Sequence, residues 1–217
     1  MTSISIWPPQ PPRPPEPPQY PPPSPWRPEP RPSVAPAPSM QVVVAPEDWL
    51  TERLLDQRIV ALAGELDTES VNHAVASLAL LDASGDAPVR VRLSGVSAGL
   101  DAVLTLVDAL DLVDAPVHAT ALGTLTGPAV ALLAVADRRV VGPHAVLRLT
   151  EPRTPRGLSG REVETAAEQR SHLLRRLQER LARACGRPVE EVAADMRAGR
   201  VLSAQEARTY GLADDEA

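Results

Sequence analysis

The chain has 217 residues, with 22 basic side chains, all of them Arg, and 28 acidic ones, for a formal net charge of −6. This balance offers no basic footprint for nucleic acid and no polybasic patch for a membrane surface. The longest apolar stretch, at 128–136, is about half of the ~20 residues that a membrane span needs, and no secretory signal is readable. A single cysteine excludes a disulfide framework and predicts a cytoplasmic protein.

Proline divides the chain into two parts. Of the 25 prolines, 17 lie in residues 1–40. Proline lacks the backbone donor that helices and sheets need, and it favours the extended polyproline II conformation. We therefore predict a disordered proline-rich segment at 1–40 and one α/β domain at 41–217. Residues 17–20 match the PPxY pattern that WW domains bind, so a role of the segment as a proline-rich ligand stays open.

From residue 41 the apolar pattern alternates between the periods of strands and of helices. Apolar or alternating runs predict strands at 41–45, 58–63, 88–93, 116–122, 139–141 and 145–149. Helical spacing and capping residues predict helices at 47–57, from Asp67 or Thr68 to 84–85, at 100–113, 128–136, 161–184 and 189–197, and from Ser203 to Gly211. Repeated strand–helix units indicate a mainly parallel sheet covered by helices. No nucleotide-binding loop, zinc-protease motif or CxxC pair occurs, so no cofactor or metal is predicted.

Two stretches stand out at the ends of the body: LTERLLDQRIVALAGEL at 50–66 and LSAQEARTYGLAD at 202–214. The first resembles the run that opens the mature domain of the Clp protease proteolytic subunit family, ClpP, and the second resembles the C-terminal signature of that family. The resemblance covers roughly 47–215. It implies a ClpP/crotonase-type spiral of strand–helix units, subunits assembled in stacked rings, and a Clp ATPase as partner. The helix at 161–184 corresponds to the handle through which these rings stack, although its mixed Arg and Glu residues also suit a solvated face.

The family's serine peptidase site can be followed onto this sequence residue by residue. Its nucleophile passage, GMAASMGAFLL, corresponds to 123–133, where the serine position is Gly127. The histidine that acts as general base corresponds to Thr150, and the triad carboxylate corresponds to Asp195. A glycine has no nucleophile, and a threonine hydroxyl cannot take a proton near neutral pH. Of the catalytic triad, the resemblance therefore leaves only the carboxylate.

The oxyanion loop of the family, NSPGG, corresponds to 94–98, and Ser97 and Ala98 stand in place of its two glycines. Glycines there let backbone N–H groups approach the developing oxyanion. A serine hydroxyl is also a poor nucleophile unless a base removes its proton. We therefore predict a catalytically silent ClpP-like protein, a structural or regulatory subunit of a Clp protease assembly. The alternative is an active Clp-type serine endopeptidase subunit with a rebuilt site, or with a site that this correspondence misplaces.

Four other residues bear on a relocated site. A one-residue shift of the correspondence would bring Thr126 to the nucleophile position, where it would still need a base. His144 shares a strand face with Thr150 but precedes it by roughly 20 Å along an extended chain. Glu151 is adjacent to Thr150, and the alternation of a strand predicts that the two point to opposite faces. Cys185 has no base beside it in the sequence.

Overall fold

The computed structural model describes residues 46–152 and 161–216. Two predictions lie outside these residues: the proline-rich segment at 1–40 and the strand at 41–45. No helix of the described part is both long and apolar enough to cross a membrane.

The described chain alternates strands with helices. The strands are β1 (Ile59–Leu66), β2 (Val89–Ala98), β3 (Val117–Leu122), β4 (Thr124–Thr126), β5 (Arg138–Val141), β6 (Val146–Arg148), β7 (Val201–Ser203) and β8 (Asp215–Glu216). The helices are α1 (Pro46–Asp56), α2 (Thr68–Ala83), α3 (Leu100–Asp111), the 3-10 turn η1 (Gly127–Ala129), α4 (Val130–Ala134), α5 (Arg161–Cys185), α6 (Val189–Ala198) and α7 (Ala204–Tyr210). The predicted α/β class is confirmed.

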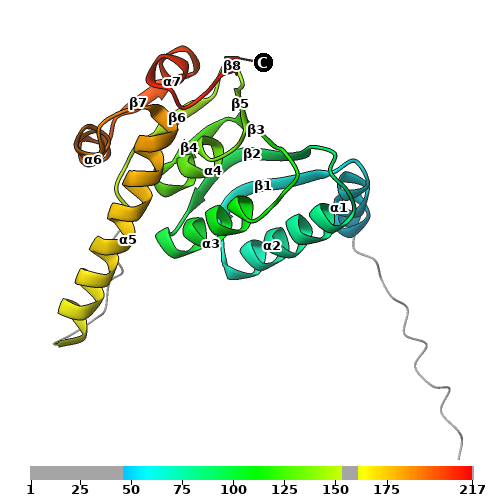
Figure 1. Cartoon of the computed structure of the whole chain (residues 1–217), viewed down its shortest axis with the longest axis horizontal. Coiled ribbons are helices and arrows are strands. Elements are labelled where there is room, and N and C mark those ends of the chain that lie inside the picture. Colours follow the sequence, from blue (N-terminus) through cyan, green and yellow to red (C-terminus); the bar gives the residue numbers. More distant parts are fainter. Residues whose placement is uncertain (1–45, 153–160, 217) are drawn as a thin grey trace, which may run out of the picture. The chain divides into compact units, whose positions relative to one another are not determined.

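The strands of the described residues form a single sheet. Its order is β7-β6-β4-β2-β3-β5-β8, with β1 paired to the other side of β2. Only the β6–β7 pair is antiparallel. Figure 1 shows α2 and α3 side by side along the sheet, whereas α5 is a long helix that extends past it. Val89, Val91 and Leu93 of β2 are at most 2% exposed and pack in one core with the inner faces of α2 and α3.

Helix ends follow the predicted capping residues. Asp67 caps α2 through a hydrogen bond from the Ser70 amide, and Ser203 and Glu206 form the predicted capping box of α7. Gly211, with φ of 92°, ends α7 in the left-handed region that favours glycine. These local signals satisfy the backbone groups that a helix end leaves without partners.

Two predicted strand ends are wrong. The strand predicted at 58–63 was expected to stop before Gly64, but β1 runs on to Leu66. It continues because Gly64 adopts φ of 73° and absorbs a register shift against β2. The strand predicted at 88–93 was expected to be followed by a loop at 94–98, but β2 continues to Ala98. It continues because β1 pairs with this segment on one side and β4 begins to pair on the other.

Arg139 holds the C-terminal end of the fold against the sheet. Its guanidinium donates to the Asp214 carboxylate, to the Gly211 carbonyl at 2.7 Å and to the Ala184 carbonyl at 3.2 Å. The hydrogen bond from Arg139 holds the pKa of Asp214 below its usual value. The folded state therefore favours the charged form of this carboxylate.

This contact predicts a loss of stability in acid. A carboxyl group whose pKa is lowered by folding stabilises the protein above its unfolded-state pKa, and this contribution disappears as the pH falls through the folded-state pKa. We expect the unfolding temperature to fall between about pH 5 and pH 3, and Asp214→Asn to remove part of that dependence. Thermal melts of both proteins across this range measure it. An unchanged pH slope in the variant would show that the contact does not contribute.

Candidate active site

The position that corresponds to the nucleophile lies in a strand–turn–helix passage. β4 ends at Thr126, Gly127 turns the chain with φ of 64° and begins η1, and Pro128 is the second residue of η1. Proline suits the first turn of a helix because its φ is already helical and its missing N–H would have no partner there. The apolar run of α4 follows and is almost fully buried, which anchors the turn. A sharp turn between a strand and a helix is also where α/β hydrolases hold their nucleophilic serine.

Gly127 lies directly against Thr150. A Cβ atom built on Gly127 would lie 3.2 Å from Thr150 Oγ1 and 3.3 Å from the Thr150 carbonyl oxygen. The backbone on either side of Thr150 is fixed by hydrogen bonds from the Leu149 amide to the Arg200 carbonyl and from the Glu151 amide to the Met196 carbonyl. The fold thus brings together the two positions at which the resemblance puts nucleophile and base, and neither residue can perform that chemistry.

A cleft of about 560 Å³ opens over this pair. Its walls include backbone and small side chains from the ends of β2 and β4, and charged side chains of both signs. The lining residues are Glu65, Ser97, Ala98, Gly99, Leu100, Asp101, Thr126, Gly127, Pro128, Arg148, Thr150, Glu151, Pro152 and Arg170. Among them is neither a histidine nor a cysteine. The cleft is large enough to hold a peptide side chain, but the residues that line it provide no imidazole base and no thiol.

Ser97 and Ala98 line the cleft, and they do so from the end of strand β2. Ser97 is paired in register with Glu65 of β1 and with Thr126 of β4. A strand segment held on both sides differs from a glycine loop that can aim N–H groups at an oxyanion. The backbone of this segment therefore pairs with neighbouring strands of the sheet.

One expectation about neighbouring residues is wrong. Thr150 and Glu151 were expected on opposite faces of a strand, yet both line the cleft. The reason is that β6 ends at Arg148, so the alternation of a strand no longer applies. The Glu151 carboxylate is exposed and faces Arg197 at 4.0 Å. No hydrogen bond within the described residues joins it to the hydroxyl of Thr126 or Thr150.

Asp195 is engaged in a network of its own. Its Oδ2 accepts hydrogen bonds from the Tyr210 hydroxyl at 2.8 Å and from Arg200 at 3.0 Å. The Tyr210 ring is 2% exposed, and the guanidinium carbons of Arg187 and Arg200 lie 4.1 and 5.1 Å from its centre. Burial, followed by the hydrogen bond to Asp195, raises the pKa of Tyr210 above its usual value. The carboxylate thus ties α6 to α7.

No sequence pattern pointed to this network. Tyr210 is part of the C-terminal stretch 202–214 that carries the resemblance, but nothing local connects it to Asp195. The contact forms only when α6 and α7 fold back on each other around β7.

The remaining reactive side chains lie elsewhere. Cys185 is half-buried, and burial raises its pKa to about 11 despite the nearby charges of Arg139 and Arg187, so the thiol stays protonated at neutral pH. His144 and His172 are exposed side chains that do not reach the cleft.

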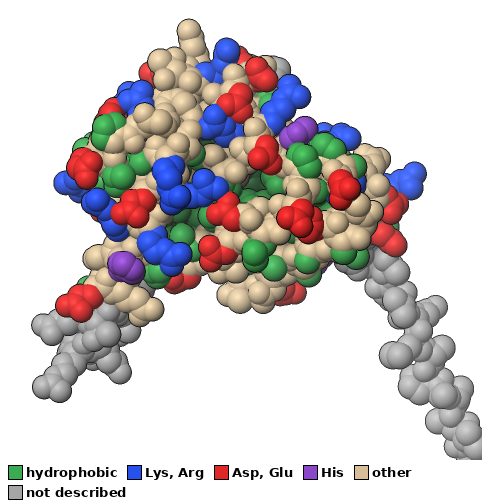
Figure 2. Space-filling view, in the orientation of Figure 1, with side chains coloured by type: hydrophobic (Ala, Val, Ile, Leu, Met, Phe, Trp, Pro, Cys, Tyr) green, Lys and Arg blue, Asp and Glu red, His purple; other side chains and the backbone are tan. Residues whose placement is uncertain are grey.

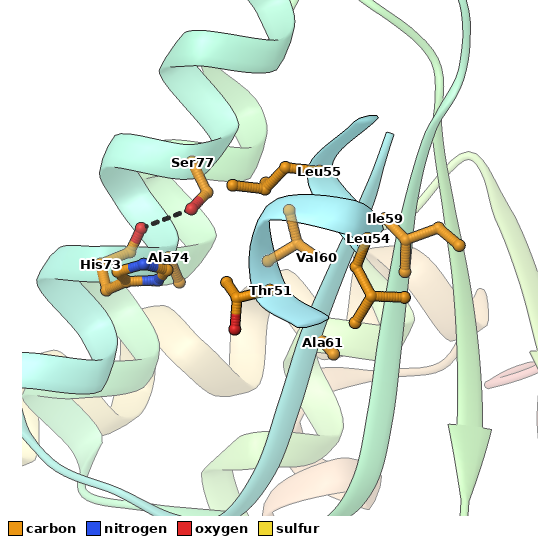
Figure 3. A pocket seen from close by; sticks show the side chains of 9 residues that line it. All are labelled: Thr51, Leu54, Leu55, Ile59, Val60, Ala61, His73, Ala74 and Ser77. Atoms are coloured by element: carbon orange, nitrogen blue, oxygen red, sulfur yellow. Dashed lines mark hydrogen bonds between the residues drawn. The ribbon is translucent and has the colours of Figure 1, made fainter. Parts of the chain in front are cut away.

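A second, smaller cavity of about 110 Å³ lies between α1, β1 and α2 (Figure 3). A serine and a histidine, Ser77 and His73, are both among its lining residues. The Ser77 hydroxyl donates to the backbone carbonyl of His73 at 2.8 Å, not to its imidazole. This is the ordinary contact of a helical serine with the preceding turn, so it does not activate the hydroxyl. Nor do the described residues include a group of three His, Cys, Asp or Glu side chains that could hold a metal ion.

A mainly parallel sheet with helices packed on it and a cleft over a strand–turn–helix passage defines an α/β protein. The chain belongs to the Clp protease family, whose model matches residues 46–215. It is 26% identical over 172 residues to an ATP-dependent Clp protease proteolytic subunit of Pleurastrum terricola, covering 77% of this chain and 88% of that protein. It is 28% identical to proteolytic subunit 2 of Nocardia farcinica and 29% identical to proteolytic subunit 3 of Rhodococcus jostii, each over 170 residues covering 77% of this chain and 84% of the relative.

Proposed function

We propose that this chain is a catalytically silent member of the Clp protease family, a structural or regulatory subunit of a Clp protease assembly. The observation that carries the proposal is the contact between Gly127 and Thr150 in the cleft. The nucleophile and its base act as a unit, and losing both leaves at most about 10³–10⁴ of catalysis over water. That is too little for a working peptidase.

The cleft itself supports binding without cleavage. Gly127 has φ of 64° in a strand–turn–helix passage, and it lines a cleft of about 560 Å³. We propose Ser97 and Ala98 as the remnant of the oxyanion site and Asp195 as the remnant of the triad. A peptide end held there would meet no attacking group.

The proposed partners are ClpP-type subunits in a ring and, through that ring, a Clp ATPase, all in the cytoplasm. The relatives are named as proteolytic subunits of ATP-dependent Clp proteases, and two of them carry subunit numbers, as expected where several such chains coexist. A catalytically silent subunit would reduce the number of active sites in a mixed ring while still forming part of the ring.

Native mass spectrometry of the assembly purified from its own cells, with and without a fluorophosphonate probe, tests this proposal. We expect this chain to gain no probe mass while an active partner subunit in the same particle gains one probe per chain. A purified active ClpP subunit serves as the labelling control.

Probe mass on this chain would favour the alternative, an active Clp-type serine endopeptidase with a rebuilt site. Peptide mapping would then identify the labelled residue, with Ser97 and Thr126 as the hydroxyls of the cleft to examine first. That result would overturn the assignment of Gly127 to the nucleophile position.

A further inference from the structure

A row of four polar side chains crosses the sheet within the cleft. Glu65 of β1 is paired in register with Ser97 of β2. Thr126 of β4 is paired with Ser97 on one side and with Arg148 of β6 on the other. Residues paired in this way point to the same face of a sheet, and all four line the cleft. We call these four residues the charged row, because a carboxylate and a guanidinium stand at its ends and two hydroxyls between them.

Buried neighbours show which way the charged row points. Val96, Leu125 and Leu147 each precede one member of the row, and all three are fully buried in the core. Because successive residues of a strand point to opposite faces, the row faces away from that core. Glu65 and Arg148 are both exposed, so the two charged ends of the row are accessible to a ligand in the cleft.

The spacing of the two charges fits a short peptide. Neighbouring strands are about 4.8 Å apart, so three steps separate the backbones of Glu65 and Arg148 by about 14 Å. The next position in register beyond Arg148 is the apolar Val201 of β7, so the cation is the last charge of the row. An extended peptide rises about 3.3 Å per residue. The row therefore spans a chain of about four residues.

Neither charge of the row is neutralised by the part of the chain that the structure describes. Glu65 and Arg148 make no side-chain hydrogen bond or ion pair with any residue of that part. Arginines elsewhere are paired. Figure 2 shows basic and acidic side chains next to one another over α3 and α5, where Arg180 donates to Asp111 at 2.6 Å. The ends of the row are thus available for charges of a ligand.

The other charged residues of the cleft lie off the row. Asp101 belongs to α3 and Arg170 to α5, and the Glu151 carboxylate faces Arg197 at 4.0 Å. They add to the total charge of the cleft but leave the order of charges along the row unchanged.

We infer that the cleft binds short peptides by their two free ends, with the terminal carboxylate at Arg148 and the terminal ammonium at Glu65. A guanidinium donates paired hydrogen bonds to a carboxylate, and such charge-assisted bonds are stronger than neutral ones. The hydroxyls of Ser97 and Thr126 both donate and accept, which suits the amide groups between the two ends. A longer chain passing through the cleft has no charged ends at this spacing, so the row favours short peptides.

The inference rests on the proposed function, because a bound peptide stays intact only where no nucleophile attacks it. Hydrolysis of a polypeptide releases short peptides with a free ammonium and a free carboxylate. A peptidase reaction is therefore the class of reaction that supplies this ligand.

Isothermal titration calorimetry of the full chain with tetra-alanine tests the inference. We expect tetra-alanine amide, and separately N-acetyl-tetra-alanine, to bind about tenfold more weakly or worse than the peptide with both ends free. Hexa-alanine is also expected to bind more weakly, because its ends are about 20 Å apart when it is extended.

Two variants assign each end of the peptide to its residue. Arg148→Gln should weaken the binding of tetra-alanine to that of the amide and bind the acid and the amide equally. Glu65→Gln should likewise remove the difference between the free and the acetylated peptide. Arg90→Gln, which changes an exposed arginine of β2 outside the cleft, is the matched control and leaves binding unchanged. Thermal melts show that each variant folds.

Equal affinity of the unmodified chain for free and end-blocked peptides would overturn the inference, as would an absence of binding to tetra-alanine. An Arg148→Gln variant that still prefers the acid to the amide would do the same. The end-blocked peptides need no variant, so their result does not depend on the folding of any substitution. Mass spectrometry of the recovered peptide separates the two proposals. A cleaved peptide contradicts the silent subunit, whereas an intact peptide bound regardless of its ends contradicts only the role of the charged row.

Discussion

Gly127→Ser combined with Thr150→His is expected to make this chain react with a fluorophosphonate probe, whereas the unmodified chain does not. A Cβ at position 127 lies 3.2 Å from the Thr150 hydroxyl oxygen, so a serine and an imidazole at these positions are within hydrogen-bond reach. Probe mass by intact-protein mass spectrometry measures the reaction. The single variants Gly127→Ser and Thr150→His are the matched controls, since each lacks one partner, and both are expected to stay unlabelled.

Peptide turnover by the double variant should remain low. The imidazole at position 150 would need a carboxylate to orient it, but Asp195 already accepts hydrogen bonds from Tyr210 and Arg200. Losing the orienting carboxylate costs a serine protease about 10⁴ in kcat. We therefore expect labelling with turnover about 10⁴ below that of an intact triad.

The backbone conformation of Gly127 determines how much stability the double variant loses. Its φ of 64° is a conformation that a serine adopts at about 1–2 kcal/mol, so the double variant melts at a lower temperature but stays folded. A folded double variant that never reacts would show that positions 127 and 150 do not correspond to the nucleophile and the base.

Asp195→Ala is expected to lower the free energy of unfolding by about 1–3 kcal/mol, because it leaves a buried phenol and a guanidinium without their acceptor. For a domain of this size, that corresponds to a fall of roughly 3–10 °C in the unfolding temperature. Differential scanning calorimetry measures the change. The physical reason is that the carboxylate joins Tyr210 of α7 and Arg200 to α6.

A double-mutant cycle separates this network from a general effect of the substitution. Tyr210→Phe removes only the hydroxyl, so its cost should overlap with that of Asp195→Ala, and the two changes together should cost less than their sum. Thr150→Ala, in the cleft and outside the network, should add to Asp195→Ala without coupling. Strict additivity of Asp195→Ala and Tyr210→Phe would contradict the proposed network.

Much of the fold follows from local sequence signals. The apolar periods predict β3, α3 and α6 to within a few residues, and Asp67, the Ser203–Glu206 box and Gly211 mark helix ends because capping depends on groups only a few residues apart. The resemblance to one family selected Gly127 and Thr150, since it compares residues position by position and needs no distances.

Only the tertiary structure decided how distant segments meet. β7 and β8 are two or three residues long, too short for any period, and exist because neighbouring strands offer them hydrogen-bond partners. β2 runs past residue 94 for the same reason. Asp195 turns to Tyr210 and Arg200 instead of toward the cleft because packing of α6 against α7 sets its partners. Sequence patterns record interactions along a few residues of chain, whereas pairing and packing between separate elements depend on where the whole chain places them.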